Sequence, residues 1–182
     1  KRHFQETRLI LQDIIKGKKV YIAMSGGVDS SVTAALLRES GGDCTGVFMI
    51  VHDFAQQHCE DAKKIAEHIG IKFEALDLRN DFKAVLDYFS SQYKQARTPN
   101  PCVFCNRNIK FGILFDYARS KGADFFATGH YVSIHRQGSN AYLYAGQTHK
   151  DQSYALAMIH RSILPYLIFP LGELNKDQTR SI

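Results

Sequence analysis

Strand-like and helix-like segments alternate along the chain at a nearly constant period, and this alternation limits the possible folds more than any other feature. We expect strands over residues 18–24, 44–51, 71–78 and 123–132, and helices over residues 29–41, 55–70, 81–96 and 109–122. Such alternation is typical of a parallel sheet with helices on both faces. The sequence therefore predicts a doubly wound, mostly parallel α/β fold with a small extra segment at the C-terminus.

Changes in this pattern divide the chain into three parts. Residues 1–17 are expected to form an N-terminal helical extension that ends at Gly17. The apolar face of that helix carries Phe4, Leu11, Ile14 and Ile15. Residues 18–133 hold the α/β domain. Residues 134–182 are expected to begin with a hairpin that turns at residues 138–140 and to continue as a helical segment.

Composition excludes several classes of protein. No apolar run approaches the roughly 20 residues that cross a bilayer, so we expect no membrane span. The charged N-terminus lacks the apolar block of a secretory signal. Four cysteines, two of them in one CxxC, predict a reducing and therefore cytoplasmic location rather than a secreted disulfide scaffold. The net charge of +5 is a weak indication of a polyanionic partner.

The stretch "SGGVDSS" follows the first expected strand and opens the first expected helix of the α/β domain. Gly26 and Gly27 let the backbone pass close to an anion, which the N–H groups at the start of the helix then face. Asp29 is a candidate ligand for a magnesium ion that bridges phosphates. The stretch is neither GxxxxGK[ST] nor GxGxxG. It predicts a phosphate-binding loop; the competing interpretation is a tight turn with a helix cap.

The expected ends of three strands bring further residues to the same place. In a parallel sheet, ligands bind beyond the carboxyl ends of the strands. Residues 25–30, Met49 and residues 128–130 all lie at such ends. We therefore expect one ligand site at this edge, with His130 as a hydrogen-bonded structural histidine rather than a catalytic base.

The stretch "TPNPCVFCN", residues 98–106, carries the most distinctive chemistry of the second half. It places Cys102 and Cys105 three positions apart, in a turn-rich segment just before an apolar run. Two thiols at this spacing fit a metal site, a redox pair or a nucleophile with an unusual neighbour. They do not form a zinc site unaided, and the sequence has no HxxxH or second CxxC to complete one.

These motifs resemble those of known enzymes. "SGGVDSS" is similar to the pyrophosphate-binding loop of the N-type ATP pyrophosphatases, which have an adenine nucleotide alpha hydrolase-like fold. "TPNPCVFCNRNIKFG", "GADFFATGHYV", "KDQSYALAMI" and "FPLGELNKDQTR" follow in an order that resembles the tRNA-specific 2-thiouridylases. The resemblance runs from about Lys18 to the end of the chain. It implies an enzyme that uses ATP to replace the C2 oxygen of the wobble uridine of tRNA with sulfur.

The resemblance also implies roles for individual residues. Cys105 matches the catalytic cysteine that carries a persulfide sulfur, delivered by a sulfur-donor protein, and Asp29 matches the acidic residue of the phosphate loop. The residues implied at the ATP and its Mg²⁺ ion are Ala23, Met24, Ser25, Gly26, Gly27, Val28, Asp29, Ser30, Met49 and Gly129. The residues implied at the tRNA are Asn100, Pro101, Cys102, Lys150, Asp151 and Gln152.

The chain departs from the family at two points. The second catalytic cysteine and the β domains that help hold tRNA normally lie downstream of "KDQTR", so we expect this chain to be the catalytic domain of a longer protein. Cys102 stands where many members have Asp. Three interpretations of Cys102 remain open: an iron–sulfur ligand together with Cys105 and a third thiol, a resolving thiol that forms a disulfide with Cys105, or a neutral substitution.

Two other functions compete with tRNA 2-thiolation. Another ATP pyrophosphatase, such as a tRNA cytidine thiolase or a small-molecule amide ligase, would release AMP without depending on the wobble uridine. A non-catalytic nucleotide- or RNA-binding module would bind ATP or tRNA without turnover. A reactive thiol beside a nucleotide site favours an enzyme over a plain binding module.

Overall fold

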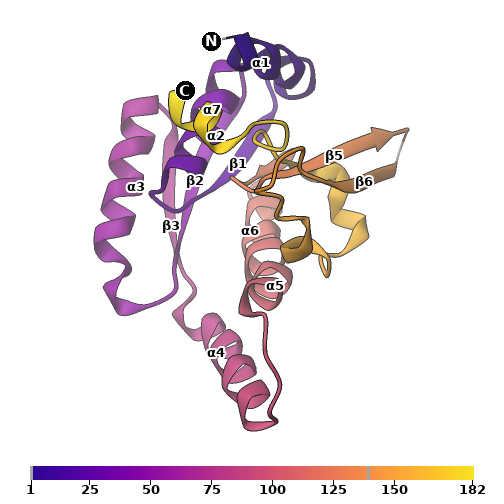
Figure 1. Ribbon diagram of the computed structural model, residues 1–182. Helices are drawn as coiled ribbons and strands as arrows, with labels where there is room; N and C mark the ends of the chain where they lie inside the picture. Colours follow the sequence, from indigo (N-terminus) through magenta and orange to yellow (C-terminus); the bar gives the residue numbers. More distant parts are fainter. Residues whose placement is uncertain (1, 139) are drawn as a thin grey trace.

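Five strands form one sheet in the computed structural model, which describes residues 2–138 and 140–182 (Figure 1). Their order is β3-β2-β1-β4-β7, and every neighbouring pair is parallel. The strands are β1 (Lys19–Met24), β2 (Asp43–Ile50), β3 (Lys72–Asp77), β4 (Phe125–Ala127) and β7 (Leu167–Ile168). The chain builds outward from β1 to β3 and then crosses to the other side of β1, so the predicted doubly wound α/β fold is confirmed.

Helices cover both faces of this sheet. One face carries α1 (Arg2–Ile15), α2 (Val28–Glu39) and α3 (Gln56–Ile69). The other carries a π-helical segment, η2 (Asn106–Leu114), and α6 (Phe115–Ser120). Alternation along β1 explains the two cores, because side chains of a strand point to opposite faces in turn. Val20 and Ile22 enter the first core, whereas Tyr21 enters the second.

The helix expected at residues 109–122 begins earlier than predicted. Helical structure runs without a break from α5 (Pro101–Cys105) through η2 to the end of α6. Pro101 occupies the first turn, where its fixed φ suits a helix and its missing N–H costs nothing. The Asn100 side chain caps this turn by accepting a hydrogen bond from the Val103 N–H at 3.3 Å. The two cysteines therefore lie on a helix and not in a loop.

The strand expected at residues 123–132 is split in the structure. β4 has three residues, and Thr128 to Tyr131 form a loop before β5 (Val132–Gln137). β5 pairs antiparallel with β6 (Asn140–Ala145), which confirms the predicted hairpin; position 139 of the turn lies outside the described residues. Short 3₁₀ helices follow, η3 (Ser153–Leu156) and η4 (Arg161–Tyr166). The chain then returns to the central sheet as β7 and ends in α7 (Lys176–Ser181).

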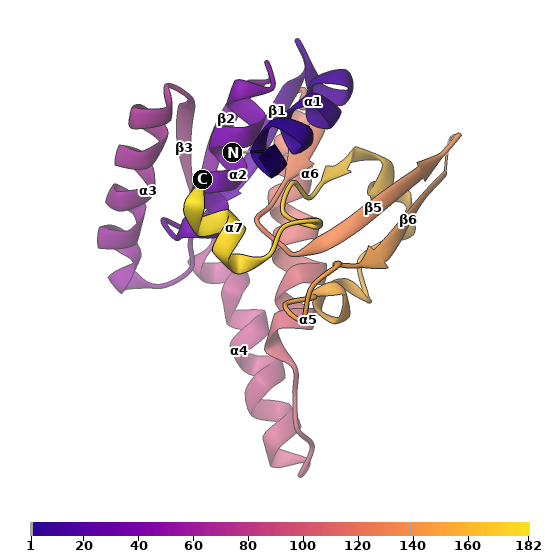
Figure 2. The same ribbon diagram turned by 45° about the horizontal axis from the view of Figure 1, so that its top comes forward.

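One long helix extends away from the sheet. A short 3₁₀ turn, η1 (Asp53–Ala55), connects β2 to α3. After β3, helix α4 (Arg79–Lys94) projects from the body of the molecule together with the segment that leads to α5 (Figures 1 and 2). The base of this projection is anchored on α5, where the rings of Tyr88 and Phe104 stack with centroids 4.4 Å apart. Within the described residues, no helix is both long and apolar enough to cross a membrane.

Candidate functional site

The loop between β1 and α2 passes directly into the start of a helix. Gly26 has a φ of +77°, a conformation that side chains disfavour, and a Cβ there would lie 3.1 Å from the carbonyl oxygen of His58. Gly27 precedes α2 and supplies no side-chain cap. The first N–H groups of a helix have no hydrogen-bond partner within that helix. At the start of α2 these groups, together with the positive end of the helix dipole, face the loop. This arrangement suits an anionic ligand, as "SGGVDSS" predicts.

Two serines hold the loop in this shape. The Ser25 N–H donates to Ser30 Oγ at 3.1 Å, and the Ser30 hydroxyl donates to the Gly27 carbonyl at 3.0 Å. Ser31 Oγ donates to the same carbonyl at 2.9 Å. These hydroxyls are engaged with the loop itself, so the backbone N–H groups are the main donors that remain for a phosphate.

Asp29 is held by residues from the far end of the chain. Lys176 Nζ, on α7, lies 2.6 and 2.7 Å from the two carboxylate oxygens, and the Tyr131 hydroxyl donates to Oδ1 at 2.8 Å. Burial, together with the bond to Asp29, raises the pKa of Tyr131 to about 12, so the phenol keeps its proton. α7 is itself fixed by reciprocal capping bonds between Asn175 and Gln178.

A pocket opens beside this loop at the carboxyl ends of β1, β2 and β4. Its lining residues are Ala23, Met24, Ser25, Asp29, Ser30, Met49, Lys110, Thr128, Gly129, His130 and Gln152. Seven of them were predicted as nucleotide-binding residues. The other three, at positions 26–28, lie outside the lining, and the Val28 side chain is exposed. We refer to this space as the nucleotide pocket.

Gly129 is constrained by packing. A Cβ at this position would lie 2.9 Å from the carbonyl carbon of Asp29 and 3.0 Å from the Ser30 nitrogen. Backbone atoms at such distances cannot be displaced without moving the start of α2. From the sequence, a glycine was expected here because a ligand comes close to the backbone. The structure gives a second reason, because the loop at residues 29–30 also packs against Gly129.

The two cysteines line a second, mostly apolar pocket. Its lining residues are Phe82, Val85, Pro101, Cys102, Cys105, Asn106, Lys110, His130, Gln152, Tyr154 and Ala155. Both thiols are free; Cys102 is exposed, whereas Cys105 is partly buried. Asn106 is buried and donates through Nδ2 to the Ala155 carbonyl at 3.0 Å, which ties the cysteine helix to η3. We refer to this space as the thiol pocket.

The two pockets share a wall. Lys110, His130 and Gln152 line both of them. Gln152 is fixed there because its Oε1 accepts a hydrogen bond from the Tyr131 N–H at 3.1 Å. His130 is fixed by a contact of 2.6 Å between its Nδ1 and Thr128 Oγ1. Burial and the nearby charge of Lys110 lower the pKa of His130 to about 3, so the ring is neutral at neutral pH. The hydrogen bond expected for His130 is present, and its structural role stays a prediction.

The predicted tRNA residues separate into different environments. Lys150 lies in a basic hollow with Lys176 and Arg180, whereas Gln152 points into the shared wall. Asp151 organises its own loop, with Oδ1 accepting from the Gly146 N–H at 2.7 Å. Burial acts to raise the pKa of Asp151, but hydrogen bonds from Ser153, Gly146 and Gln152 together hold it below its usual range. Asn100 caps α5 and lines neither pocket.

Sequence reasoning missed several residues of this site, and four of them hold or face its central groups. Lys176 and Tyr131 hold Asp29, Lys110 stands between the pockets, and Tyr154 lies 60% exposed at the thiol pocket. Each lies within a motif that the sequence singled out, but no spacing rule connects it to the phosphate loop. Lys110 lies five positions after Cys105, a spacing that brings two side chains to one face only in a π-helix, and periodicity does not predict a π-helix.

The residues present do not complete an iron–sulfur site. Iron–sulfur clusters are generally held by three or four thiolates, and Cys102 and Cys105 supply two. Among the described residues, no group of three or more His, Cys, Asp or Glu side chains is placed to hold a metal. Cys44 is a residue of β2 and is buried in the core. A cluster would therefore need a thiol from outside the described residues.

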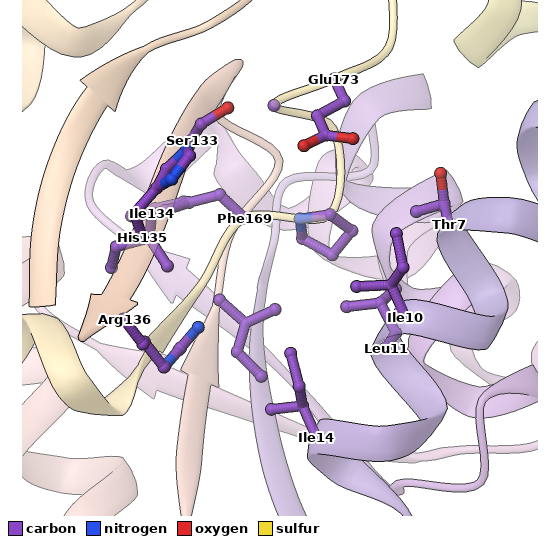
Figure 3. A pocket seen from close by; sticks show the side chains of 13 residues that line it. Thr7, Ile10, Leu11, Ile14, Ser133, Ile134, His135, Arg136, Phe169 and Glu173 are labelled. Atoms are coloured by element: carbon purple, nitrogen blue, oxygen red, sulfur yellow. The ribbon is translucent and has the colours of Figure 1, made fainter. Parts of the chain in front are cut away.

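A separate hollow lies away from both pockets and shares no lining residue with them. Side chains of α1 (Thr7, Ile10, Leu11 and Ile14) face those of β5 across it, with Phe169 and Glu173 between them (Figure 3). The Ser133 hydroxyl, which also lines this hollow, is buried without a hydrogen-bond partner among the described residues. None of its described lining residues is a cysteine or belongs to the loop at residues 25–30.

Comparison with known proteins gives one family and several relatives. Residues 18–182 match the family described as tRNA methyl transferase HUP domain. The tRNA-specific 2-thiouridylase MnmA of Treponema denticola is 44% identical over 177 residues, a match that covers 90% of this chain and 48% of that protein. The chain thus spans about half the length of the curated relatives it matches.

Solved structures extend the likeness of fold. The U34-tRNA thiolase NcsA from Methanococcus maripaludis, solved with its [4Fe-4S] cluster, is 20% identical with a TM-score of 0.63, over 98% of this chain and 62% of that one. The NH3-dependent NAD synthetase from Campylobacter jejuni is 16% identical with a TM-score of 0.62, over 99% of this chain and 70% of that one. At these identities the likeness concerns the fold alone.

Proposed function

Because the chain belongs to the tRNA methyl transferase HUP domain family, we propose that it is the catalytic domain of a tRNA-specific 2-thiouridylase. Its substrates are ATP and the wobble uridine of tRNA, and its reaction replaces the C2 oxygen of that base with sulfur. The single observation that best supports this proposal is the shared wall of Lys110, His130 and Gln152 between a nucleotide pocket and a thiol pocket. An enzyme that activates a base with ATP and then attacks it with sulfur needs these two sites side by side.

The first step adenylates the base. The uridine C2 oxygen attacks the α-phosphorus of ATP, the N3 proton is lost to water, and the bond to pyrophosphate breaks, with pyrophosphate keeping the electron pair. The N–H groups at the start of α2 bind the phosphates, and Gly26 keeps the backbone close enough for contact. Met49 supplies apolar surface for the adenine ring in the same pocket. This step converts the C2 oxygen into part of a good leaving group, AMP.

Asp29 fits a magnesium ion as well as a lysine. Magnesium is usually bound by one or two carboxylates together with substrate phosphates, and it supplies charge neutralisation during phosphoryl transfer. Asp29 presents both carboxylate oxygens toward Lys176, at the start of the anion-binding helix. When Mg²⁺ and ATP bind, Asp29 would hold the ion, and Lys176 would be released toward the phosphates.

The second step delivers sulfur through Cys105. A persulfide sulfur on this cysteine attacks C2, the C2–O bond breaks, and AMP leaves with the electron pair. A second thiol then attacks Cys105 Sγ and forms a disulfide, while the S–S bond between Cys105 and the sulfur on C2 breaks and the sulfur of the 2-thiouridine takes the electron pair. A cellular thiol must reduce that disulfide. Cys102 lies on the same short helix as Cys105 and is more exposed. This position is compatible with two roles for Cys102: the thiol that resolves the persulfide, or a substitution without effect on the reaction.

Partners and location follow from this chemistry. The tRNA must reach the thiol pocket, and the basic hollow of Lys150, Lys176 and Arg180 lies on the side of α7 from which its phosphates could be bound. A persulfide-carrying protein must reach Cys105. Both partners are found in the cytoplasm, which is also where free thiols persist.

The test measures tRNA-dependent formation of AMP and pyrophosphate from ATP by the full-length protein under anaerobic conditions. Wild type is compared with Asp29→Ala and Cys105→Ser, and unmodified tRNA with tRNA that carries cytidine at the wobble position. We expect turnover to require the uridine and Asp29, whereas Cys105→Ser should still form pyrophosphate. Turnover that ignores the wobble uridine would indicate another ATP pyrophosphatase, and ATP binding without AMP would indicate a binding module.

A further inference from the structure

Of the three described residues that line both pockets, only Lys110 is a cation. It faces the phosphate loop, through the nucleotide pocket, and Cys105, through the thiol pocket. The other members of this wall are neutral: His130 has a pKa of about 3, and Gln152 is an amide. The only positive charge that these three shared residues place beside both pockets is therefore that of Lys110.

Within residues 2–138 and 140–182, the ammonium group of Lys110 has no carboxylate counter-ion. No described residue forms a hydrogen bond or ion pair with it, although the side chain is partly buried. Burial lowers the pKa of Lys110, and the sulfurs of Cys105 and Cys102 act in the opposite direction. A partly buried cation without a carboxylate partner is costly to maintain, and an anionic ligand removes that cost. The surroundings of Lys110 thus favour the arrival of an anion.

The π-helix explains why Lys110 faces the same pocket as Cys105. In an α-helix of 3.6 residues per turn, positions five apart point in directions that differ by about 140°. A π-helix instead pairs position i with position i+5, and such segments are frequent at functional sites. The π-helical segment begins at Asn106, directly after Cys105. Gly112 shows the same geometry, since a Cβ there would lie 3.1 Å from the carbonyl oxygen of Arg107, five positions earlier.

We propose that Lys110 is a catalytic residue of the sulfur-transfer step. This proposal rests on the function proposed above. Its ammonium group contacts the phosphate of the adenylated base on one side and the persulfide anion of Cys105 on the other. In this step a C2–S bond forms from the sulfur electron pair, the C2–O bond breaks, and AMP takes the electron pair. Two anions meet at C2, and one fixed cation between them lowers their repulsion and stabilises the charge that moves to the leaving phosphate.

The experiment separates the two chemical steps. Single-turnover reactions of the full-length protein with ATP, tRNA and a persulfide donor are followed for pyrophosphate and for AMP. The variants are Lys110→Met, which keeps the length of the side chain without charge, and Lys110→Arg, which keeps the charge. Lys64→Met is the matched control, because Lys64 is exposed on α3 and lines neither pocket.

Lys110→Met should form pyrophosphate at nearly the wild-type rate but release AMP about 100-fold more slowly, as expected for loss of one preorganised charge. Lys110→Arg should recover part of that loss, and Lys64→Met should behave as wild type. Equal slowing of pyrophosphate and AMP would place Lys110 in adenylation and overturn the assignment. Release of AMP by Lys110→Met at the wild-type rate would also overturn it.

A second readout does not depend on tRNA. The rate at which iodoacetamide alkylates Cys105, located by peptide mass mapping, is measured against pH in the same variants. Burial raises the pKa of the Cys105 thiol, and Lys110 opposes that effect, so Lys110→Met should move the alkylation profile to higher pH. If wild type forms no AMP with tRNA, the proposed function fails, and an unchanged alkylation profile would separately show that Lys110 does not act on Cys105.

Discussion

Single side chains connect distant parts of this chain. Asp29 opens the phosphate-binding helix, and its partners Tyr131 and Lys176 come from 102 and 147 positions downstream. The side chains of Asp29 and Lys176 are each about one-third exposed, with relative areas of 32% and 31%, so solvent weakens their attraction. We therefore propose that the pair acts mainly to position α7 over the loop, and that it separates when a Mg²⁺–ATP complex binds at Asp29.

His130 gives a pH-dependent stability at the scale of one residue. Its pKa in the folded protein is about 3, against 6.5 for an ordinary histidine, so between these values the unfolded chain binds a proton that the folded chain does not. The free energy of unfolding is therefore not reduced by His130 above pH 6.5, and it decreases as the pH falls from 6.5 toward 3. We expect the urea midpoint of wild type to fall across this window, and that of His130→Asn to fall less.

The control for this measurement is His68→Asn, a replacement at an exposed histidine in the last turn of α3. It should retain the wild-type dependence on pH. If His130→Asn and wild type lose stability in parallel below pH 6.5, the ring of His130 titrates normally and its burial does not exclude the charge.

At the scale of elements, the loop after β4 and the start of α2 are built against each other. Gly129 allows this contact, since a Cβ would lie 2.9 Å from the Asp29 backbone. The same loop carries Thr128 and His130 into the nucleotide pocket. A change in the loop therefore moves the phosphate-binding backbone even without contacting ATP.

Gly129→Ala should weaken ATP binding by shifting the start of α2, and overpacking of this kind costs about 1–3 kcal/mol of folding stability. Equilibrium binding of ATP and the unfolding midpoint would be measured on the same protein. Gly122→Ala is the control for a glycine without neighbours within 4 Å, although its φ of +79° adds backbone strain. Gly129→Ala with normal ATP affinity would show that the loop and α2 can separate freely.

At the scale of the whole molecule, the N-terminal extension belongs to the core. The family match begins at residue 18, yet Leu11 and Ile15 of α1 are buried among residues of β1 and α2. Ile15 has no exposed surface. The expected apolar face of this helix is confirmed at Leu11, Ile14 and Ile15, whereas the side chain of Phe4 lies outside the described residues.

Ile15→Ala should destabilise the whole domain by about 2–5 kcal/mol, because it removes a fully buried side chain and leaves a cavity. Denaturant unfolding monitored by circular dichroism would measure this loss. Leu9→Ala, on the exposed side of the same helix, should cost less than 1 kcal/mol. Equal and small effects would mean that α1 docks without supporting the core.

Local sequence determined the elements and most of the nucleotide pocket. Hydrophobic period and glycine positions predicted the strands and helices of residues 18–96, because those signals act over a few residues. "SGGVDSS" predicted the anion-binding loop for the same reason, since a strand, two glycines and a helix start are contiguous. Ligands bind beyond the carboxyl ends of parallel strands, and this rule alone predicted that Met49 and Gly129 lie near that loop.

Tertiary structure decided what joins these parts. Periodicity cannot distinguish a π-helix from an α-helix over nine residues, so the direction of Lys110 was not predictable from its spacing to Cys105. Neither was the return of α7 to Asp29, because contacts across 147 positions depend on the path of the whole chain. The sequence by itself determined which chemistry the chain carries. The fold decided which charges stand between the phosphate site and the sulfur, because that depends on packing between segments that no local rule relates.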